Sequence, residues 1–389
     1  MFDNLIGPEI PLSRVLQFWP VLALSFVSAL VATSLCKKIA LKLGIVDKPD
    51  NLVKTHKTTV AYLGGVGILA GLTVGILTGI YWLGSGRGGF VLDQEHFRLS
   101  LTWLIGILSG AAIACFVGLT DDIFDLKPRY KFLGQILAAC TLLLAGIRPN
   151  LYYITDPLNV QISENLEVIL SSLIVFIFVL GATNSLNLLD GLDGLCAGVT
   201  AIITIALLLL SIHLATWGYS TTGDPVRIVI CLGLVGSVCG FLPFNRHPAK
   251  IFMGDAGSML LGFTAAALML LFAERVPRWW LASVVVFGLP ILDTTTALAR
   301  RLINRRPLFV SDRGHIYDQM IDRGISLKKT VTICYLLAGV YAVIGLAMSQ
   351  IRTWYAAGVY VFVFVMSGII VWWRGYLKME GLRGAIRKQ

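Results

Sequence analysis

Three aspartates, Asp121, Asp122 and Asp125, lie close together in the segment G-L-T-D-D-I-F-D-L-K-P-R-Y-K. Helical spacings of three and four residues place Asp125 on the same face as one or other of its neighbours. Clustered carboxylates repel one another unless a cation compensates their charge. The segment therefore indicates a divalent metal or a basic partner. The alternative is a solvated helix end, neutralised by Lys127, Arg129 and Lys131.

A second segment, N-S-L-N-L-L-D-G-L-D-G-L, repeats polar residues at helical spacing. Asn184, Asn187 and Asp190 recur every three residues and so share one side of a helix end. Asp190 and Asp193 are each followed by glycine, which forms tight turns and lets the backbone approach a ligand closely. A purely structural turn needs only one such pair, so the two pairs favour a binding function.

Asp255 stands near the start of an apolar run, between Gly254 and Gly257. A helix N-terminus with small neighbours suits phosphate oxygens, and the carboxylate could hold the metal ion that bridges them. The alternative is a simple aspartate cap of the helix. The same loop adds three further polar residues, Asn245, His247 and Lys250.

Two basic segments could bind phosphate groups. Residues 300–329 carry eight Lys and Arg residues, Arg313 among them, with His315 in the middle. Arginine recognises phosphate through paired hydrogen bonds, so this segment could hold a pyrophosphate. The other segment offers Lys54, His56 and Lys57 before the Gly64-Gly65 pair. The alternatives are a purely topological role for the first segment and a structural role for His56.

The composition indicates which elements must position these residues. The chain has 389 residues, 56% hydrophobic and 14% charged, whereas soluble chains average about 25% charged residues. Uncharged apolar runs near the ~20 residues that a transmembrane helix needs recur along the chain, without the alternating pattern of an outer-membrane barrel. We therefore predict an all-α integral membrane protein. The eleven predicted spans are 15–36, 62–83, 101–120, 132–147, 166–187, 195–213, 227–243, 257–273, 279–299, 330–349 and 354–373.

We predict a single transmembrane domain over residues 1–389, because no internal repeat, long linker or soluble domain separates the spans. The first span lacks the basic n-region and cleavage site of a signal peptide, so we expect it to be retained. The seven cysteines have no metal-ligand spacing, which favours a role as small buried hydrophobic residues.

The positive charges favour one of the two sets of loops between the spans. The set 37–61, 121–131, 188–194, 244–256, 300–329 and 374–389 carries 24 of the 32 Lys and Arg residues. The positive-inside rule predicts this set on the cytoplasmic side, with the N-terminus outside and the C-terminus inside. The net charge of +10 is then mainly a signal for the orientation of the protein in the membrane, with some attraction to anionic lipid. We predict no nucleic-acid binding, because no aromatic-basic module is present.

The candidate segments, in this order, resemble the polyprenyl-phosphate N-acetylhexosamine-1-phosphate transferase family. The resemblance extends from about Leu43 to Gly324 and rests mainly on the acidic motifs. The family includes the peptidoglycan phospho-MurNAc-pentapeptide translocase and the GlcNAc-1-phosphate transferases that start O-antigen and teichoic acid synthesis. The resemblance implies ten or eleven helices with the active site on the cytoplasmic side.

The resemblance also assigns roles to the acidic and basic residues. Asp121 and Asp122 match the paired catalytic aspartates, which we also expect near the metal, and Lys131 matches the basic residue downstream of them. Asp255 matches the magnesium-binding aspartate. His315 matches the first histidine of the HxHH motif, and we expect it to contact phosphate together with Arg313.

Further matches concern the sugar nucleotide. Asn184, Asn187, Asp190 and Asp193 match the asparagine-rich DGxDG motif. Asp193, Asn245 and Phe252 match the uridine pocket, in which the phenylalanine suits stacking on the base. We add Lys54 to the residues expected to bind the sugar nucleotide.

Two motifs depart from the family pattern. The HxHH motif reads His315-Ile316-Tyr317-Asp318, so two of its histidines are absent. The H-x-x-P-x-P-x-x-G-G motif has Thr59 and Ala61 in place of the prolines. This segment still resembles the GlcNAc-type enzymes more than the pentapeptide translocase, whose G-T-P-T-M-G-G run is missing. We therefore expect a UDP-N-acetylhexosamine donor without a peptide.

The expected reaction is attack of a polyprenyl phosphate on the β-phosphate of this donor, with release of UMP. The expected cofactor is Mg²⁺, with Mn²⁺ as an alternative, and the expected location is the plasma (inner) membrane, with a homodimer suggested by the family. Three alternatives remain. They are phospho-MurNAc-pentapeptide transfer, transport of an anionic solute, and a regulator or scaffold that kept the fold. A transporter is disfavoured because carriers usually bind near the bilayer midplane and often have repeated halves.

Overall fold

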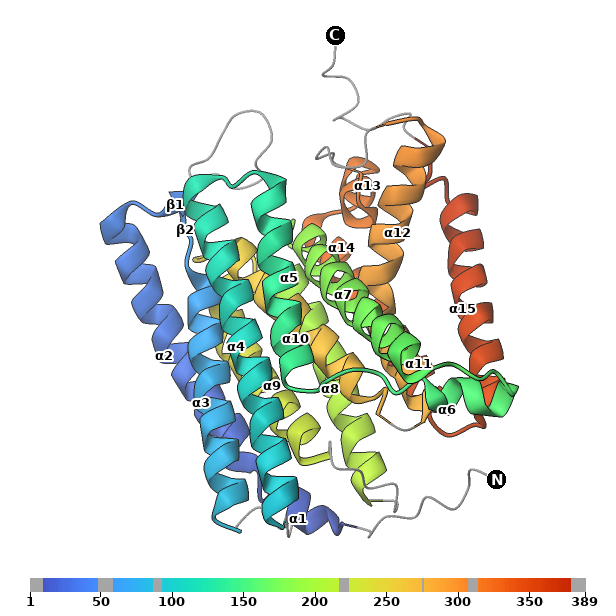
Figure 1. Cartoon of the computed structure of the whole chain (residues 1–389). Coiled ribbons are helices and arrows are strands. Elements are labelled where there is room, and N and C mark those ends of the chain that lie inside the picture. The colour runs from blue at the N-terminus through green and yellow to red at the C-terminus, as the bar shows by residue number, and fades with distance from the viewer. Residues whose placement is uncertain are drawn as a thin grey trace.

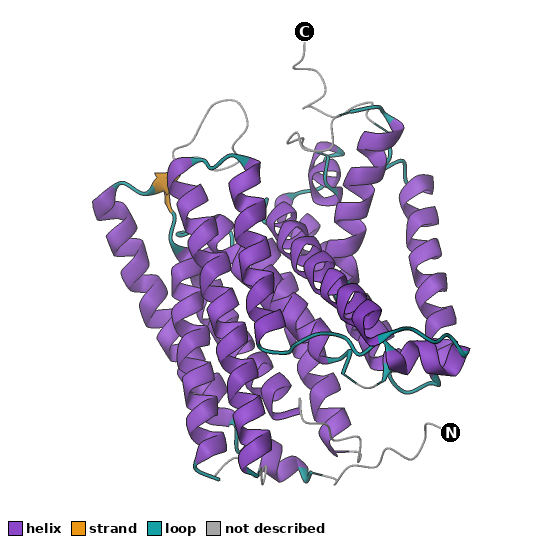
Figure 2. Cartoon of the chain, in the orientation of Figure 1, coloured by secondary structure: helices purple, strands orange, loops and turns teal. Residues whose placement is uncertain are grey.

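The apolar runs form helices because a helix satisfies its own backbone hydrogen bonds, which lipid cannot do. The computed structural model describes residues 10–47, 59–86, 93–216, 224–274, 276–306 and 314–378. Within these ranges nearly every segment is helical, with one short pair of strands (Figure 2). The protein is therefore an all-α polytopic membrane protein, as predicted.

Fifteen α-helices, one 3-10 helix and two strands make up the described ranges. In chain order they are α1 (Leu12–Leu16), α2 (Trp19–Leu43), β1 (Val46–Asp47), β2 (Val60–Ala61), α3 (Gly64–Gly84), α4 (Gln94–Phe124), α5 (Pro128–Leu144), α6 (Tyr152–Thr155), η1 (Asp156–Leu158), α7 (Glu164–Leu189), α8 (Leu195–Thr216), α9 (Asp224–Asn245), α10 (Gly254–Leu271), α11 (Pro277–Val286), α12 (Gly288–Ile303), α13 (Ile316–Asp322), α14 (Leu327–Met348) and α15 (Thr353–Trp373).

Nine helical segments of the described chain are long and apolar enough to cross a membrane, with α1 and α2 counted as one segment. The bent pair of α11 and α12 adds a tenth if it is one span. α5 has 17 residues, about the minimum length for a span. The predicted number of eleven spans therefore stays a prediction.

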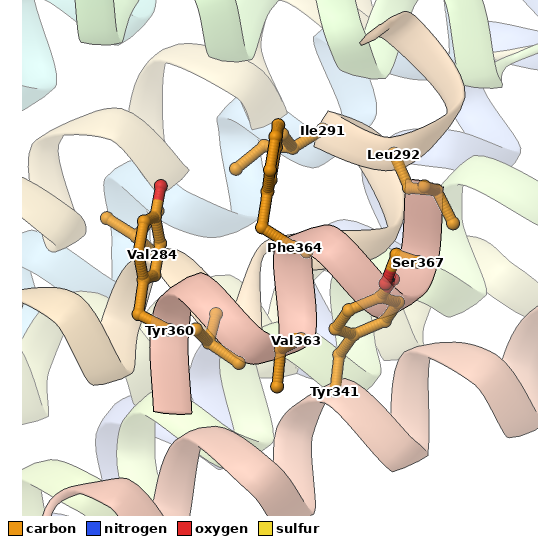
Figure 3. A pocket seen from close by; sticks show the side chains of 10 residues that line it. Val284, Ile291, Leu292, Tyr341, Tyr360, Val363, Phe364 and Ser367 are labelled. Atoms are coloured by element: carbon orange, nitrogen blue, oxygen red, sulfur yellow. The ribbon is translucent and has the colours of Figure 1, made fainter. Parts of the chain in front are cut away.

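The predicted span 279–299 is bent in the structure, where α11 and α12 meet at an angle of 68°. Pro290 lies in the first turn of α12 and has no N–H to donate to the carbonyl of Val286, so the helical ladder breaks there. A small apolar cavity of about 40 Å³ lies beside the bend, against α14 and α15. Figure 3 shows its lining, where the Tyr341 hydroxyl lies 2.6 Å from Oγ of Ser367.

Two other predicted boundaries also shift. The predicted loop 121–131 shrinks to three residues, because α4 continues to Phe124 and α5 already begins at Pro128. The predicted loop 300–329 contains the end of α12 and all of α13. In both places helical structure continues into polar sequence, which a hydropathy pattern marks as loop.

The core lies around α9 and α10. Of the residues in their apolar, membrane-spanning stretches, 89% and 94% are buried, against 11% in α15. α10 packs against α3, α4 and α7. Glycines allow these close contacts: a Cβ on Gly118 of α4 would lie 2.3 Å from the backbone of Asp255, and one on Gly65 of α3 would lie 2.3 Å from the nitrogen of Gly257. The N-terminus of α10 is thereby enclosed by neighbouring helices.

A short backbone network fixes the segment before α10. β1 and β2 pair antiparallel, with Val46 opposite Ala61, and Ala61 also bridges to Ile251. Gly64 and Gly65 donate their N–H groups to the carbonyls of Phe252 and Met253 at 3.0 and 3.1 Å. The strands, the α4–α5 connection and α13 lie at one end of the bundle, and α1 and α6 lie at the other (Figure 1).

The seven cysteines are free, five of them buried and the other two partly buried. This agrees with their predicted role as small hydrophobic residues.

Candidate active site

Asp122 binds the N-terminus of α10 from the end of α4. Its two carboxylate oxygens accept the N–H groups of Asp255 and Ala256 at 2.8 and 3.1 Å. These N–H groups have no partner within their own helix, and the helix dipole favours a negative charge there. Gly254, with φ +67°, leaves space for the carboxylate, because a Cβ there would lie 2.3 Å from Asp122 Oδ2. Asp122, at the end of α4, therefore caps the N-terminus of α10, a helix much later in the sequence.

This contact changes the interpretation of Asp255. The N-cap position of α10 is Met253, which makes no side-chain cap, so Asp255 is not the simple cap that was the alternative. Its side chain is instead directed to other helices. Lys131 of α5 donates from Nζ to Asp121 Oδ2 at 3.0 Å and also to Asp255 Oδ2. Lys131 is thus a basic partner shared by two of the predicted carboxylates.

α7 supplies the amide groups predicted from the N-S-L-N segment. Nδ2 of Asn187 donates to Asp255 Oδ1 at 2.7 Å and to Oγ of Ser258 at 3.0 Å. Asn184, one turn earlier, donates to Gln135 of α5 at 3.1 Å. Asn187 therefore joins the acidic cluster directly, while Asn184 connects α7 to α5 beside it.

The turn between α7 and α8 holds Asp190 and Asp193. Burial, together with the charges of Asp255, Asp122 and Asp193, raises the pKa of Asp190 well above its usual value. Asp190 thus lies in the electrostatic field of the acidic cluster.

Asp193 and Asn245 join this turn to the segment before α10. Asp193 Oδ2 accepts the N–H of Ala249 at 3.1 Å and lies 2.7 Å from Nδ1 of His247. Asn245 is buried, accepts from the N–H of Gly194 and donates to the carbonyl of Ile251, both at 3.1 Å. The amide of Asn245 is therefore engaged within the protein.

Phe252, predicted to stack on a base, lies next to Tyr62, with ring centroids 5.9 Å apart. Burial and the charges of Asp47, Asp122, Asp190 and Asp255 raise the pKa of Tyr62. Tyr62 therefore belongs to the site, although the sequence analysis did not select it. An aromatic residue two positions before a glycine pair has no distinctive signal in an apolar run.

His315 is buried and bonded to a residue that sequence reasoning missed. Its Nδ1 lies 2.8 Å from Asp293 Oδ2, and Asp293 Oδ1 accepts the N–H of Ile316 at 2.7 Å. A signal for Asp293 was available, because an ionisable residue inside an apolar span is a functional candidate by default. Arg300, one of the predicted basic residues, is fully buried and donates to the carbonyl of Gly314.

Of the remaining predicted residues, the structure places one, Asp125, outside this cluster. Asp125 is exposed and ends α4 with φ +51°. Lys54, His56, Lys57 and Arg313 lie outside the described residues.

The carboxylates of the cluster could hold a magnesium ion. Mg²⁺ prefers hard oxygen ligands, keeps several waters and often uses only one or two protein carboxylates. Asp121 and Asp255, which face the same Lys131 ammonium, offer such a pair. Within the described ranges no three His, Cys, Asp or Glu side chains are arranged to hold a metal ion by themselves. The residues fit an ion whose remaining coordination positions are filled by water and substrate.

Comparison with known proteins gives a consistent result. The family model of Glycosyl transferase family 4 matches residues 104–273, which extend from α4 through α10 and contain all the acidic motifs. A protein of Bacillus subtilis, named as a probable undecaprenyl-phosphate N-acetylglucosaminyl 1-phosphate transferase, is 30% identical over 347 residues, 88% of this chain and 87% of its own length.

Two other relatives have closely similar names. A decaprenyl-phosphate N-acetylglucosaminephosphotransferase of Mycobacterium tuberculosis is 32% identical over 80% of this chain and 77% of its own. An undecaprenyl-phosphate alpha-N-acetylglucosaminyl 1-phosphate transferase of Yersinia pestis is 26% identical over 89% of each chain. With these matches and the acidic cluster at the start of α10, the chain belongs to the polyprenyl-phosphate N-acetylhexosamine-1-phosphate transferase family of membrane enzymes.

Proposed function

We propose that this protein transfers GlcNAc-1-phosphate from UDP-GlcNAc to an undecaprenyl-type polyprenyl phosphate, with release of UMP. This reaction would be the first membrane step of a cell-envelope glycan. The observation that carries the proposal is Lys131, which joins Asp121 and Asp255 beside the capped N-terminus of α10. Relatives whose names describe the same transfer support it.

The side chains of the cluster suit phosphoryl transfer. Catalysis of this reaction consists largely of positioning and of compensating charge on phosphate oxygens. Lys131 offers an ammonium group, and Asn187 donates to the other oxygen of the Asp255 carboxylate at 2.7 Å. The carboxylate of Asp122 accepts the N–H groups of Asp255 and Ala256 at the start of α10. This contact holds the backbone of Asp255 in place within the site.

We propose Mg²⁺ as the cofactor, held by Asp255 and Asp121 with Asp122 close by, and Mn²⁺ would suit the same oxygens. When bound, the ion would neutralise negative charge on the diphosphate and on the leaving UMP. The second pKa of a phosphate monoester is about 6, so the lipid phosphate needs little deprotonation at neutral pH. We therefore favour direct attack, in which the aspartates orient groups rather than form a covalent intermediate.

We further propose that the site faces the cytoplasm from the plasma (inner) membrane, where a soluble UDP-sugar and a lipid phosphate can meet. The distribution of 24 of 32 Lys and Arg residues supports this orientation. Anionic lipid at that surface would attract the same basic loops. A homodimer remains the expectation that the family resemblance gives.

The test is a transfer assay with purified protein, undecaprenyl phosphate and radiolabelled UDP-GlcNAc. We expect label in a lipid product whose mass equals the prenyl diphospho-GlcNAc, and we expect Asp255→Asn to abolish it. Transfer by Asp255→Asn with undiminished magnesium dependence would contradict the metal assignment. Label from UDP-MurNAc-pentapeptide but not from UDP-GlcNAc would instead identify a translocase.

A further inference from the structure

Tyr317 of α13 reaches the turn between α7 and α8. Its hydroxyl donates a hydrogen bond to the carbonyl of Leu188 at 2.8 Å. Gly191 packs against the same group, because a Cβ there would lie 2.2 Å from the tyrosine hydroxyl. Leu188 and Gly191 lie on either side of Asp190 in the chain. The tyrosine therefore contacts the turn on both sides of a site carboxylate.

The ring of Tyr317 rests on a fixed support. It stacks on the imidazole of His315, with centroids 5.6 Å apart and an interplanar angle of 9°. His315 is bonded through Nδ1 to Asp293 of α12, and Asp293 also accepts the first N–H of α13. His315 and Asp293 are 5% and 1% exposed. Because His315 and Asp293 are both buried, the contact between them fixes the imidazole on which Tyr317 stacks. In this way α12, which carries Asp293, sets the position of Tyr317.

The far end of the same turn is held by other elements. Asp193 is bonded to Ala249, and Gly194 donates to Asn245. The hydroxyl of Tyr335 in α14 donates to the carbonyl of Gly194 at 2.6 Å. Between Leu188 and Gly191, Tyr317 donates a side-chain hydrogen bond to the backbone of the turn. Loss of the Tyr317 hydroxyl should therefore loosen the part of the turn that carries Asp190.

We propose, building on the function proposed above, that Tyr317 is a positioning residue for the sugar-nucleotide donor. It holds the turn 188–194 against α13, so that Asp190 and Asp193 keep the geometry in which the donor binds. Tyr317 occupies the third position of the His315-Ile316-Tyr317-Asp318 run, so this chain uses a hydroxyl there to fix the donor turn.

The first variant is Tyr317→Phe, which removes only the hydroxyl. In the full-length purified protein we expect faster amide hydrogen exchange in a peptide that covers residues 188–194. We expect the KM for UDP-GlcNAc to rise by about threefold to tenfold, the effect of losing one hydrogen bond. The kcat should stay within about twofold, and the KM for undecaprenyl phosphate should not change, because neither depends on donor affinity.

The matched control is Tyr341→Phe. Tyr341 also donates or accepts one hydrogen bond, with Ser367, beside the apolar cavity at the helix bend (Figure 3). It lies six residues after Tyr335 along α14, about 9 Å further from the turn. This variant loses the same chemical group, so it should leave the exchange of 188–194 and the donor KM unchanged.

Asp293→Asn tests the support behind the tyrosine. If Asp293 and Tyr317 act as one unit, the double variant should raise the donor KM by less than the product of the two single effects. A donor KM raised by the full product of the two single effects would mean that the two residues act independently. It would overturn the part of the proposal that assigns His315 and Asp293 as the support.

The exchange experiment also separates this proposal from the function proposed above. Unchanged exchange in Tyr317→Phe would overturn the positioning role, whatever the activity. A lower kcat with an unchanged donor KM would overturn it as well. If the wild-type protein transfers no label from any UDP-sugar, the proposed function fails, and hydrogen exchange still decides whether Tyr317 holds the turn.

Discussion

At the scale of single residues, the site is defined by how its negative charges are compensated. The carboxylate of Asp122 faces the N–H groups of α10, and those of Asp121 and Asp255 share the ammonium of Lys131. Each carboxylate thus has a partner from another part of the chain. Removing one such partner leaves a partly buried charge uncompensated, which costs more than the hydrogen bond itself.

Lys131→Met should therefore lower transfer strongly. We expect kcat to fall by at least about 100-fold, the usual effect of removing one charge-stabilising group from an active site. Lys127→Met is the matched control, because Lys127 is an exposed lysine at the start of α5, four residues before Lys131, and should leave transfer unchanged. Initial rates with radiolabelled UDP-GlcNAc measure both variants. More than half of wild-type activity in Lys131→Met would show that the bridge is not needed for transfer.

A second residue-scale prediction concerns Asp190, whose pKa is raised by burial and by neighbouring carboxylates. As pH rises above the ordinary value of 3.8, the unfolded chain releases this proton while the folded protein retains it. The contribution of Asp190 to stability therefore falls with rising pH, up to its raised folded pKa. Asp190→Asn removes this dependence, so its melting temperature relative to wild type should increase between pH 5 and pH 8.

Melting curves in EDTA across this pH range measure the effect. Added magnesium should reduce the difference if an ion compensates the neighbouring carboxylates. Asp156→Asn is the control, because Asp156 is exposed and directly follows α6, which lies at the opposite end of the bundle (Figure 1). A difference between Asp190→Asn and wild type that shrinks as pH rises would contradict the assigned direction.

The sequence predicted the polar residues of the site better than their partners. Asp121, Asp122, Asn187 and Asp255 stood out because polar residues at the ends of apolar runs are costly and therefore informative. The contacts of Asp293 and Tyr317 depend on how α12 and α13 pack, which residue spacing does not encode. Asn245 was predicted as part of a uridine pocket, and this role stays a prediction; its amide is bonded to Gly194 and Ile251. Type and spacing predict which groups are present, and packing decides what they contact.

At the scale of elements, small residues decide how closely the helices can approach. α4 and α10 meet at Gly118, where a Cβ would lie 2.3 Å from the carbonyl carbon and oxygen of Asp255. This crossing brings Asp122 within reach of the N-terminus of α10. Hydropathy predicted both helices, but it could not predict the crossing or the 68° bend between α11 and α12. Pro290 is a local sequence signal for the bend. Gly118 marks the crossing only once the structure is known.

Gly118→Ala should push α10 away from α4. Overpacking of this kind costs about 1–3 kcal/mol, so we expect a lower melting temperature and a strong loss of transfer. Gly181→Ala in α7 is the control, because nothing lies within 4 Å of a Cβ built there. Alanine favours helix over glycine, so the control should be as stable as wild type or slightly more stable. Equal melting temperature and activity in both variants would contradict the close crossing.

At the scale of the whole molecule, the acidic site lies at the same end of the bundle as the described parts of the basic loops. The α4–α5 connection and α13 share this end, while α6 lies at the other (Figure 1). The proposed cytoplasmic position of the site rests on the positive-inside rule and not on the helices alone, because a helical bundle could insert either way round. The orientation is the part of the proposed function that decides whether a soluble UDP-sugar can reach Lys131.

Single cysteines at exposed positions test this orientation. Lys127→Cys lies next to the site and Asp156→Cys lies at the opposite end, and both positions are exposed. In right-side-out vesicles a membrane-impermeant maleimide should label Asp156→Cys, and it should label Lys127→Cys only after the membrane is opened. The parent protein is the control for background labelling, since its seven cysteines are buried or partly buried. The reverse pattern would place Asp121, Asp255 and Lys131 in the outer compartment, where a cytoplasmic UDP-sugar could not reach them.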